Sequence, residues 1–423
     1  MRIEIICTGD EVLTGKIVNT NFTYISQKLE DHGLSVKWET TVGDDREDLL
    51  HAFQAAGGRA DAVIVNGGLG PTVDDLSQEI AAQAAGVELE LHQGWLARMK
   101  EMFARRGRTM SPNNVKQAML PAGAELVDNP VGTACGFGVT IGKARFYFTP
   151  GVPRELRPML EQEILPRLLQ RGGEQAVIRL KRFHSFGLGE SHVDSLLDGV
   201  ATSAPGSNVK LGFRAHYPQL ETKLTVRGRD EADVAAKLAP VEQEVRRRIG
   251  NFILAEDGDT LEGVVLSLLA ERCASLAVAE TLTGGQVAAR LLALAGAETV
   301  FCRGTVASSG VKLAEALSIT SVDAAGTVVD VATSVAHAAR RQSGATHGLA
   351  VLVDMQADAD GRGESGAISV AIATEDSLAV RSSLLAGGRD WVRSGAIEMA
   401  LDCLRRLLLG LPVDEKIDFE KAM

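Results

Sequence analysis

Short apolar runs alternate with amphipathic segments along the first part of the chain, to about residue 172. The apolar runs predict strands, and the segments between them have apolar positions at helical spacing. Strands and helices that alternate in this way favour a mostly parallel sheet covered on both faces by helices. The expected strands are 2–7, 34–41, 62–65 and a hairpin at 137–141 and 144–148; the expected helices are 21–32, 46–56, 75–85, 93–106 and one from about 154.

The pattern changes twice after that point. Residues 173–255 combine strand-like runs with helical segments, which indicates a small α+β module, and from residue 256 an α/β pattern returns. The sequence therefore predicts three domains, at 1–172, 173–255 and 256–423. The expected strands are 176–183, 209–213, 220–226, 275–279, 299–307 and 348–353, and the expected helices are 190–197, 231–249, 261–272, 286–295 and 391–409.

The composition narrows the classes of function. Lys and Arg number 44 against 55 Asp and Glu, which leaves a net charge of −11, and aromatic residues make up only 4%. An acidic chain with few rings is not attracted to phosphate backbones or anionic membranes, so neither nucleic acid nor a membrane is an expected partner. No run approaches the roughly 20 apolar residues of a membrane span. Because the start of the chain does not resemble a signal peptide and the five cysteines form no CxxC pair, we expect a cytoplasmic protein with reduced thiols.

Three loops that follow expected strands carry glycines and carboxylates together. Ligands of open parallel sheets bind beyond the carboxyl ends of the strands, so these loops are expected to converge. Glycine lets backbone N–H groups approach phosphate oxygens, and clustered carboxylates hold hard divalent cations that neutralise phosphate and activate water. The loops therefore predict metal-assisted chemistry on a phosphorylated ligand. Their carboxylates are Asp10 and Glu11, Asp44 and Asp45, and Asp74 and Asp75; the third loop adds Gly67, Gly68, Gly70 and Thr72.

Each loop also has a purely structural explanation. Asp75 stands where a helix N-cap is expected, and Asp44-Asp45 could start the following helix in the same way. Asp10-Glu11 fits a solvated turn, and Gly67-Gly68 fits an ordinary strand-to-helix turn. We favour the functional explanation because three such loops in one domain are hard to attribute to coincidence.

Longer motifs in the same domain identify a resemblance. The chain contains, in order, TGDEVLTGKIVNTN, NGGLGPTVDD, SPNNVKQAMLP, NPVGTACGF and FTPGVPRE. Together they resemble the N-terminal domain of the CinA-like (competence/damage-inducible) proteins, which is related to molybdopterin-binding domains. The resemblance implies a molybdopterin-binding-like three-layer α/β fold. It also implies a metal-dependent ADP-ribose pyrophosphatase that yields AMP and ribose 5-phosphate.

The resemblance gives the loop residues their expected roles. Metal-activated water would attack one phosphorus of the diphosphate, the carboxylates would hold the metal or act as base, and the glycine loop would cradle the phosphates. The sequence does not separate metal ligand from base. The expected cofactor is a divalent ion, either Co or Mg, and a monovalent cation is a further, open expectation. The expected catalytic residues are Asp10, Asp44, Asp74 and Asp75, the metal ligands Asp10, Glu11, Asp45 and Asp74, and the substrate-binding residues Gly67, Gly68, Gly70, Thr72, Asn129, Gly132, Thr133 and Glu155.

The middle segment resembles the KH-type connector of the same family, most clearly in the stretch FHSFGLGES. A KH domain that binds nucleic acid needs a GxxG loop, and here Gly187-Leu-Gly-Glu ends in glutamate. His184, His192 and His216 have irregular spacing, which favours surface or packing histidines over metal ligands. We expect a structural module that supports a homodimer.

The last domain resembles the nicotinamide-nucleotide (NMN) deamidase domain of the family, with changes at its site. The family motif A-E-S-C-T-G-G reads Ala279-Glu-Thr-Leu-Thr-Gly-Gly here, so Thr281 replaces the nucleophilic serine. Lys312 is either a remnant of the family's Y-S-N-x-x-K stretch or a surface lysine, and the acidic segment 352–359 replaces the glycine loop T-G-I-A-G-P-G-G. We expect a retained fold without deamidase activity. The degenerate site comprises Glu280, Thr281, Thr283, Gly284, Gly285 and Lys312.

Two other functions stay open at this stage. The first domain could bind a pterin or a nucleotide without turnover, because a fold does not decide chemistry. Alternatively, Thr281 could still deamidate NMN, which would make the chain a bifunctional enzyme. The favoured substrate is ADP-ribose or a related nucleotide diphosphate.

Overall fold

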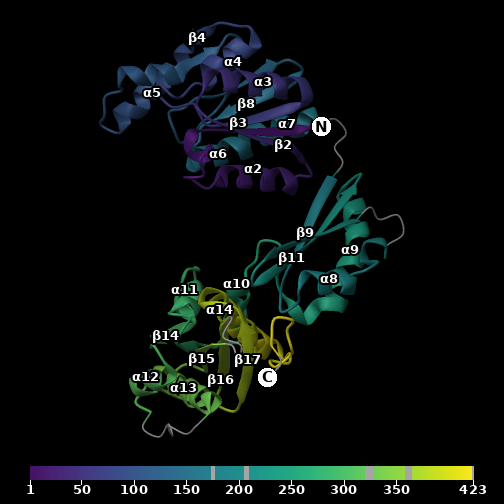
Figure 1. Ribbon diagram of the computed structural model, residues 1–423, viewed down its shortest axis with the longest axis vertical. Helices are drawn as coiled ribbons and strands as arrows, with labels where there is room; N and C mark the ends of the chain where they lie inside the picture. Colours follow the sequence, from purple (N-terminus) through teal and green to yellow (C-terminus); the bar gives the residue numbers. More distant parts are fainter. Residues whose placement is uncertain (173–176, 204–208, 320–326, 358–363, 422–423) are drawn as a thin grey trace. The chain divides into compact units, whose positions relative to one another are not determined.

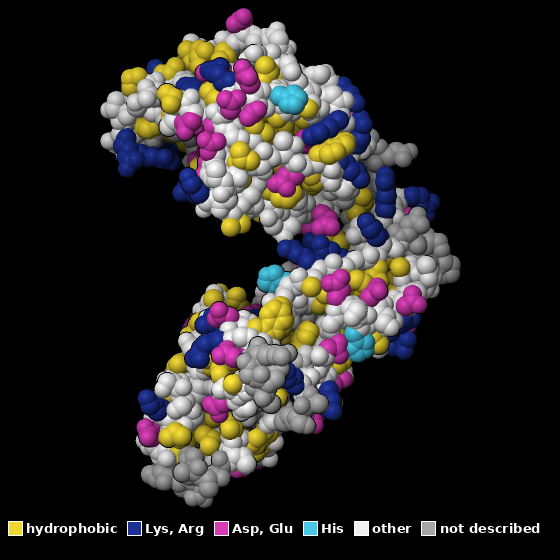
Figure 2. All heavy atoms as spheres, in the orientation of Figure 1, with side chains coloured by type: hydrophobic (Ala, Val, Ile, Leu, Met, Phe, Trp, Pro, Cys, Tyr) yellow, Lys and Arg dark blue, Asp and Glu magenta, His cyan; other side chains and the backbone are white. Residues whose placement is uncertain are grey.

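The computed structural model describes residues 1–172, 177–203, 209–319, 327–357 and 364–421. They form two compact units, drawn in Figure 1. The N-terminal unit contains Met1–Arg179 and Gly228–Asp230, and the C-terminal unit contains Leu180–Arg227 and Glu231–Met423. The expected connector and the expected last domain therefore share one unit. On the face that Figure 2 draws, acidic and basic side chains are interspersed over both units.

A six-stranded sheet forms the centre of the N-terminal unit. Its strands are β1 (Ile3–Thr8), β2 (Val36–Val42), β3 (Ala62–Asn66), β6 (Glu125–Val127), β7 (Gly136–Ile141) and β8 (Ala144–Thr149). They lie in the order β2-β1-β3-β8-β7-β6, and the first four run parallel. Because β3 lies between two parallel neighbours and under helices on both faces, all of its residues are buried.

Helices cover both faces of this sheet (Figure 1). They are α2 (Thr20–Asp31), α3 (Arg46–Arg59), α4 (Ser77–Ala85), α5 (Gln93–Arg105), α6 (Pro153–Met159) and α7 (Leu165–Arg171). One apolar cluster joins α3, α4 and α5 to one face, and a second joins α2, α6 and α7 to the other. The predicted three-layer α/β fold is confirmed. The structure adds elements that the sequence did not predict: the short helix α1 (Asp10–Leu13) in the first loop, and a strand pair of β4 (Leu89–Leu91) and β5 (Met119–Pro121).

The predicted α+β module forms the first part of the C-terminal unit. Its elements are β9 (Val177–Phe186), α8 (Glu190–Leu196), β10 (Val209–His216), β11 (Gln219–Gly228), α9 (Glu231–Ile249) and β12 (Ile253–Glu256). The strands lie in the order β10-β11-β9-β12. Alternate residues of β11, from Leu220 to Val226, are buried, which is the period of a strand with one covered face.

The rest of the C-terminal unit is a five-stranded sheet in the order β14-β13-β15-β16-β17, with helices packed on both faces. The strands are β13 (Leu276–Glu280), β14 (Phe301–Val306), β15 (His347–Ala357), β16 (Glu364–Ala373) and β17 (Leu378–Ala386), and the helices are α10 (Leu261–Glu271), α11 (Gln286–Leu292), α12 (Gly310–Ala316), α13 (Val328–Ser343) and α14 (Arg389–Leu409). The sequence did not predict β16 or β17. No helix among the described residues is long and apolar enough to cross a membrane.

The end of the chain covers the Gly187-Leu-Gly-Glu loop of the connector module. The backbone N–H of Asp418 donates to Gly187 O, and its carboxylate accepts from the N–H of Gly189, both at 2.7 Å. The same carboxylate lies 2.9 Å from Nδ1 of His192. A side chain at Gly187 would collide with Ile417, and Gly187 also has a φ of +99°. These contacts give both glycines and His192 structural roles, as the interpretation of a structural connector expects.

Candidate functional site

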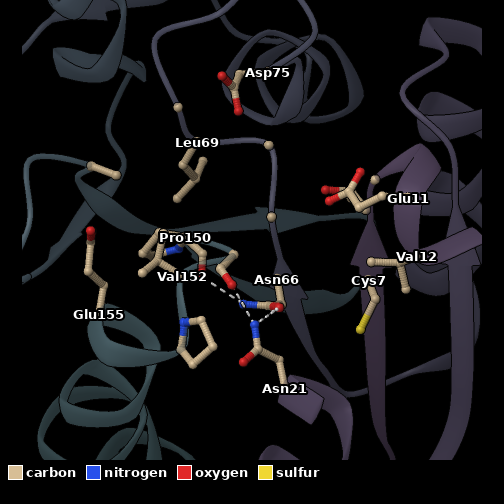
Figure 3. A pocket seen from close by; sticks show the side chains of 18 of the residues that line it. Cys7, Glu11, Val12, Asn21, Asn66, Leu69, Asp75, Pro150, Val152 and Glu155 are labelled. Carbon is tan, nitrogen blue, oxygen red and sulfur yellow. Dashed lines mark hydrogen bonds between the residues drawn. The ribbon is translucent and has the colours of Figure 1, made fainter. Parts of the chain in front are cut away.

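A cavity of about 610 Å³ opens at the carboxyl ends of β1, β3 and β8 in the N-terminal unit. The loops that follow these strands form its wall, together with the starts of α2 and α6. Figure 3 shows Glu11 and Glu155 on opposite sides of the cavity, with Asn21 and Asn66 between them. The predicted residues that line it are Glu11, Asp44, Gly67, Gly68, Gly70, Asp74, Asp75, Thr133 and Glu155.

The glycine loop after β3 lies directly against the end of β1. A Cβ atom at Gly67 would lie 2.5 Å from the hydroxyl of Thr8 and 2.7 Å from its carbonyl oxygen. Gly67 and Gly68 also have φ angles of +118° and +68°, which side chains disfavour. The hydroxyl of Ser77, the first residue of α4, donates to Gly67 O at 2.9 Å and so ties the turn to that helix. Glycine is therefore required here by close approach and by backbone conformation together.

Asp75 closes this loop and does not cap a helix. Its carboxylate accepts from the backbone N–H of Thr72 at 2.8 Å and also contacts the Thr72 hydroxyl. Helix α4 begins two residues later, with Leu76 at its N-cap position and no side-chain cap. The N-cap explanation for Asp75 is therefore wrong. Asp74 contacts the same hydroxyl, which lowers the pKa of the Asp74 carboxyl.

Carboxylates crowd around Asp44 at the junction of the first two loops. Asp44 accepts from the backbone N–H of Asp10, and Asp10 accepts from that of Asp44, both at 3.2 Å. Burial raises the pKa of Asp44, and the negative charges of Asp10, Glu11 and Asp74 raise it further. Asp10 itself is absent from the cavity wall and reaches the site through this pairing. A cation placed here would relieve the mutual repulsion of these groups.

Asp45 has a different role from the expected metal ligand. Its carboxylate accepts from the backbone N–H groups of Glu47 at 2.8 Å and Asp48 at 3.1 Å, so it caps the start of α3. It does not line the cavity. The two neighbouring aspartates are therefore divided between the site, which has Asp44, and the helix, which has Asp45.

Asn129 and Gly132 also lie outside the cavity wall. Asn129 is fully buried, and its amide group donates to Ala134 O at 2.9 Å and to Glu155 at 2.7 Å. Its side-chain oxygen accepts from the N–H groups of Val131 at 3.1 Å and Gly132 at 2.8 Å. Asn129 thus organises the loop instead of offering a free group to a ligand. Thr72, the remaining predicted ligand residue, is likewise absent from the wall.

The cavity floor contains residues that the predicted set omits. The side-chain amide of Asn21 donates to Asn66 at 2.8 Å and to Gly151 O at 2.7 Å (Figure 3). The amide of Asn66 in turn donates to Pro150 O at 2.7 Å. The sequence does contain one signal for this contact: the polar Asn66 ends the apolar run of β3, and a buried polar side chain needs a hydrogen-bond partner.

Two buried polar atoms on the cavity wall have no hydrogen-bond partner within the described part of the chain. They are the hydroxyl oxygen of Thr8, a residue only 6% exposed, and the side-chain nitrogen of Asn19. Leaving such groups without a hydrogen bond costs about 1–3 kcal/mol each. A ligand that supplies the missing partners would recover this cost, so the two atoms are groups that a ligand in the cavity can bind.

The donor set of the cavity fits a hard divalent cation that shares its coordination with phosphate. No group of three or more His, Cys, Asp or Glu in the described part of the chain is arranged to hold a metal ion by itself. Mg²⁺, however, is commonly held by one or two carboxylates, with water and substrate phosphate as the other ligands. Asp10 and Asp44, with Glu11 and Asp74 close by, are a carboxylate group of that kind.

In the predicted degenerate site of the C-terminal unit, Glu280 and Thr281 are committed to the fold. The fully buried Glu280 accepts from the N–H groups of Val287 and Ala288 in the first turn of α11, both at 3.2 Å. The hydroxyl of Thr281 accepts from the N–H of Val353 at 2.9 Å and joins β13 to β15. The buried hydroxyl of Thr283 has no partner, and Gly284-Gly285 forms the turn with positive φ angles.

The structure also places the other two segments in which this domain departs from the family pattern, namely the one around Lys312 and residues 352–357. Lys312 is exposed in the first turn of α12, as a surface lysine would be. The segment that replaces the family's glycine loop continues β15, because residues 352–357 pair with residues 364–369 of β16. Asp358 and Ala359, the end of that segment, lie outside the described residues. The backbone of 352–357 is therefore part of a ladder and forms no phosphate-binding loop.

Family models match the chain in the same order as these parts. The model described as "Probable molybdopterin binding domain" matches residues 4–170, "Damage-inducible protein CinA KH domain" matches 180–255 and "CinA C-terminal domain" matches 258–408. The CinA-like protein of Geotalea uraniireducens (strain Rf4) is 37% identical over 423 residues, which cover 99% of this chain and 100% of that protein. The CinA-like protein of Anaeromyxobacter dehalogenans (strain 2CP-C) is 38% identical over 413 residues, or 96% and 100% of the two chains.

Among solved structures, the chain is similar to the protein CinA from Thermoplasma acidophilum, a protein described as having unknown function. The two are 33% identical, with 40% of this chain and 96% of that chain covered and a TM-score of 0.35. The ordered family matches agree with the order of the parts along the chain. The chain belongs to the CinA-like family, with a molybdopterin-binding-like domain first, a KH domain in the middle and a CinA C-terminal domain last.

Proposed function

We propose that the N-terminal unit is a metal-dependent ADP-ribose pyrophosphatase that produces AMP and ribose 5-phosphate. The observation that carries this proposal is the crowding of carboxylates around Asp44 beside a glycine loop and the unpartnered hydroxyl of Thr8. Carboxylates in mutual repulsion favour a divalent cation, and glycine backbone near such a cation favours phosphate oxygens. A diphosphate bridge between two sugars satisfies both preferences.

Each part of the cavity has a role in this reaction. A divalent ion held by Asp10 and Asp44 would supply charge neutralisation and a bound water of lowered pKa. The loop from Gly67 to Gly70 would orient the phosphates, with Asp75 keeping the loop closed. Hydrolysis adds one water across a P–O bond of the bridge, so two phosphate monoesters form, and two protons are released when both monoesters are dianions. Asp44, whose pKa is raised by burial and by the neighbouring carboxylates, lines the cavity and is the better placed of these groups to take the proton of the attacking water.

The C-terminal unit, in the same proposal, has no NMN amidohydrolase activity. Support comes from Thr281, whose hydroxyl accepts a backbone N–H inside the sheet and whose β-methyl restricts its rotation. We also propose that the chain acts as a homodimer, which light scattering of the full chain tests.

Binding without turnover is the second candidate. The absence of a complete three-ligand metal group among the described residues favours it, since a pterin or nucleotide needs no metal to be held.

The test uses metal-stripped full-length protein, ADP-ribose, and Mg²⁺ or Co²⁺ added separately. The proposal expects AMP and ribose 5-phosphate in equal amounts, only when metal is present, and strong loss in Asp10→Asn. Glu47→Gln, an exposed residue in the first turn of α3, serves as the charge-matched control and should keep wild-type activity. Tight ADP-ribose binding with no AMP under either metal would replace the proposal by the binding alternative.

A further inference from the structure

A second carboxylate stands in the cavity at a distance from the crowded group. Glu155, in the first turn of α6, is half-buried and lines the cavity. Figure 3 shows it across the cavity from Glu11, with the uncharged floor of Asn21 and Asn66 between the two. The wall is therefore acidic at both ends and neutral in the middle.

The chain holds the Glu155 carboxylate in one place. Its Oε2 atom accepts from the amide of Asn129 at 2.7 Å, and Asn129 is itself fixed because every hydrogen-bonding group of its side chain is used. The loop backbone at Gly132 comes so near that a Cβ atom there would lie 1.9 Å from Oε2. One buried asparagine and one close-packed glycine thus position a carboxylate whose other oxygen, Oε1, accepts no hydrogen bond from the described residues.

The charge of Glu155 has no cation to balance it. In the described part of the chain, Glu155 forms no ion pair with Lys, Arg or His, and it belongs to no group of three or more metal-ligating side chains. A phosphate next to it would be repelled, whereas neutral O–H donors would form charge-assisted hydrogen bonds. The part of a nucleotide that offers adjacent O–H donors and carries no charge is the ribose diol.

We propose that Glu155 accepts hydrogen bonds from the ribose hydroxyls of the substrate, with Asn129 and Gly132 as positioning residues. This inference rests on the proposed function and deepens it, because it makes the cavity selective for nucleotides with a free ribose diol. The diphosphate then lies towards Asp10 and Asp44, across the neutral floor. Nucleotide binders use the same chemistry when an acidic residue selects an unphosphorylated ribose.

The test measures binding of the two expected products to the full chain by calorimetry, with Mg²⁺ present. AMP is compared with 2′-deoxy-AMP, and ribose 5-phosphate with 2-deoxyribose 5-phosphate, so that the two arms tell which ribose is held. A charge-assisted hydrogen bond predicts that at least one product binds about tenfold more tightly than its deoxy form. In Glu155→Gln that ratio should fall to about threefold or less, while Glu90→Gln, an exposed glutamate on β4, keeps the wild-type ratio.

Gly132→Ala supplies an independent probe that leaves the charge in place. Its Cβ would displace the flexible carboxylate end of Glu155, so we expect the same loss of ribose preference in a folded protein. Equal binding of ribose and deoxyribose forms by wild type, no binding of either product, or an unchanged ratio in Glu155→Gln would overturn the proposal. If the protein hydrolyses ADP-ribose but does not discriminate between ribose and deoxyribose, only the proposed role of Glu155 is refuted. If it discriminates between them but does not hydrolyse ADP-ribose, only the proposed pyrophosphatase function is refuted.

Discussion

Two strand-to-helix turns of the same kind occur in the two units, and they differ in what their polar groups do. One follows β3 at Gly67-Gly68, and the other follows β13 at Gly284-Gly285; both have two glycines with positive φ angles. Beside the first turn, the hydroxyl of Thr8 lacks a partner and the pKa of Asp44 is raised. Beside the second, Glu280 and Thr281 bind backbone N–H groups, while the hydroxyl of Thr283 lacks a partner among the described residues.

The comparison teaches that turn geometry alone does not make a site. Both turns could bring backbone N–H groups to a phosphate, and each has an unpartnered hydroxyl beside it, so the difference lies in the carboxylates: those beside the first turn crowd together, whereas Glu280 binds backbone N–H groups. In the C-terminal unit the backbone of residues 352–357 is also unavailable to a phosphate, because it pairs with β16 as a continuation of β15. In the N-terminal unit the carboxylates beside the turn remain able to bind a ligand. In the C-terminal unit the corresponding polar groups form hydrogen bonds that hold the fold together.

The largest effect is expected from removing the charge of Asp44. We expect Asp44→Asn to lower ADP-ribose hydrolysis by about 100-fold or more, in line with the loss of a key electrostatic group. The metal-free variant should nevertheless be more stable. A raised pKa means that the folded chain binds a proton at Asp44 more tightly than the unfolded chain, so the ionised form costs stability at neutral pH. This cost disappears as the pH falls through the raised pKa.

Thermal unfolding in EDTA and product formation with Mg²⁺ check both halves of this prediction. Metal-free Asp44→Asn should unfold at a higher temperature than metal-free wild type. Because protons compete with the cation for Asp44, Mg²⁺ binding by wild type should weaken as the pH falls. If Asp44→Asn melts lower than wild type and keeps its activity, Asp44 supports the fold and not the site.

The glycine loop offers a sharp structural test. In Gly67→Ala the new Cβ meets the backbone of Thr8 and a disfavoured φ, so we expect a loss of about 2 kcal/mol or more in the free energy of unfolding. Gly58→Ala, inside α3 with open space around it, should instead stabilise by about 0.5–1 kcal/mol. Urea unfolding of both variants measures the difference, and equal effects would contradict the required close approach.

Thr281 tests the other side of the comparison. Thr281→Val keeps the shape but removes the acceptor of the Val353 N–H, which should cost about 1–2 kcal/mol. Faster hydrogen exchange in peptides that cover β13 and β15 would report this loss, and Thr281→Ser should stay close to wild type. Ammonia release from NMN by wild type, abolished in Thr281→Ala, would instead show that the hydroxyl is a nucleophile.

The smallest effect is expected at the loop that the chain end covers. Asp418→Asn weakens the contacts to Gly189 and His192 while keeping an oxygen acceptor, so exchange at the start of α8 should accelerate about two- to threefold, for a loss of about 0.5 kcal/mol. Asp414→Asn, an exposed neighbour, is the matched control. Identical exchange in the two variants would mean that the contact adds nothing measurable.

The fold could be predicted where apolar runs were long and uniform. The segment 62–65 is an unbroken apolar run and forms the central strand β3 within one residue of its expected end. The strand β16 was missed because Gly, Ala and Ser occupy much of Glu364–Ala373, so its apolar alternation is weak. It forms through pairing with β15 on one side and β17 on the other, which a local pattern does not reveal.

The site could be predicted only in part, for a related reason. Loop composition placed Glu11, Asp44 and Asp74 at the correct edge of the sheet, because parallel strands end together. It could not separate Asp44 from Asp45, since the division depends on which carboxylate turns back onto α3. The Asn21–Asn66 contact joins residues 45 positions apart, and only the folded chain brings them together.

The most direct test of the account is one product assay on metal-stripped wild-type protein. ADP-ribose and NMN are incubated separately, with and without added Mg²⁺, and the products are separated by chromatography. The account predicts AMP from ADP-ribose only with metal, and no nicotinic acid mononucleotide under either condition. Deamidated NMN together with an absence of AMP would contradict it, because the chemistry would then lie at Thr281 and not beside Asp44.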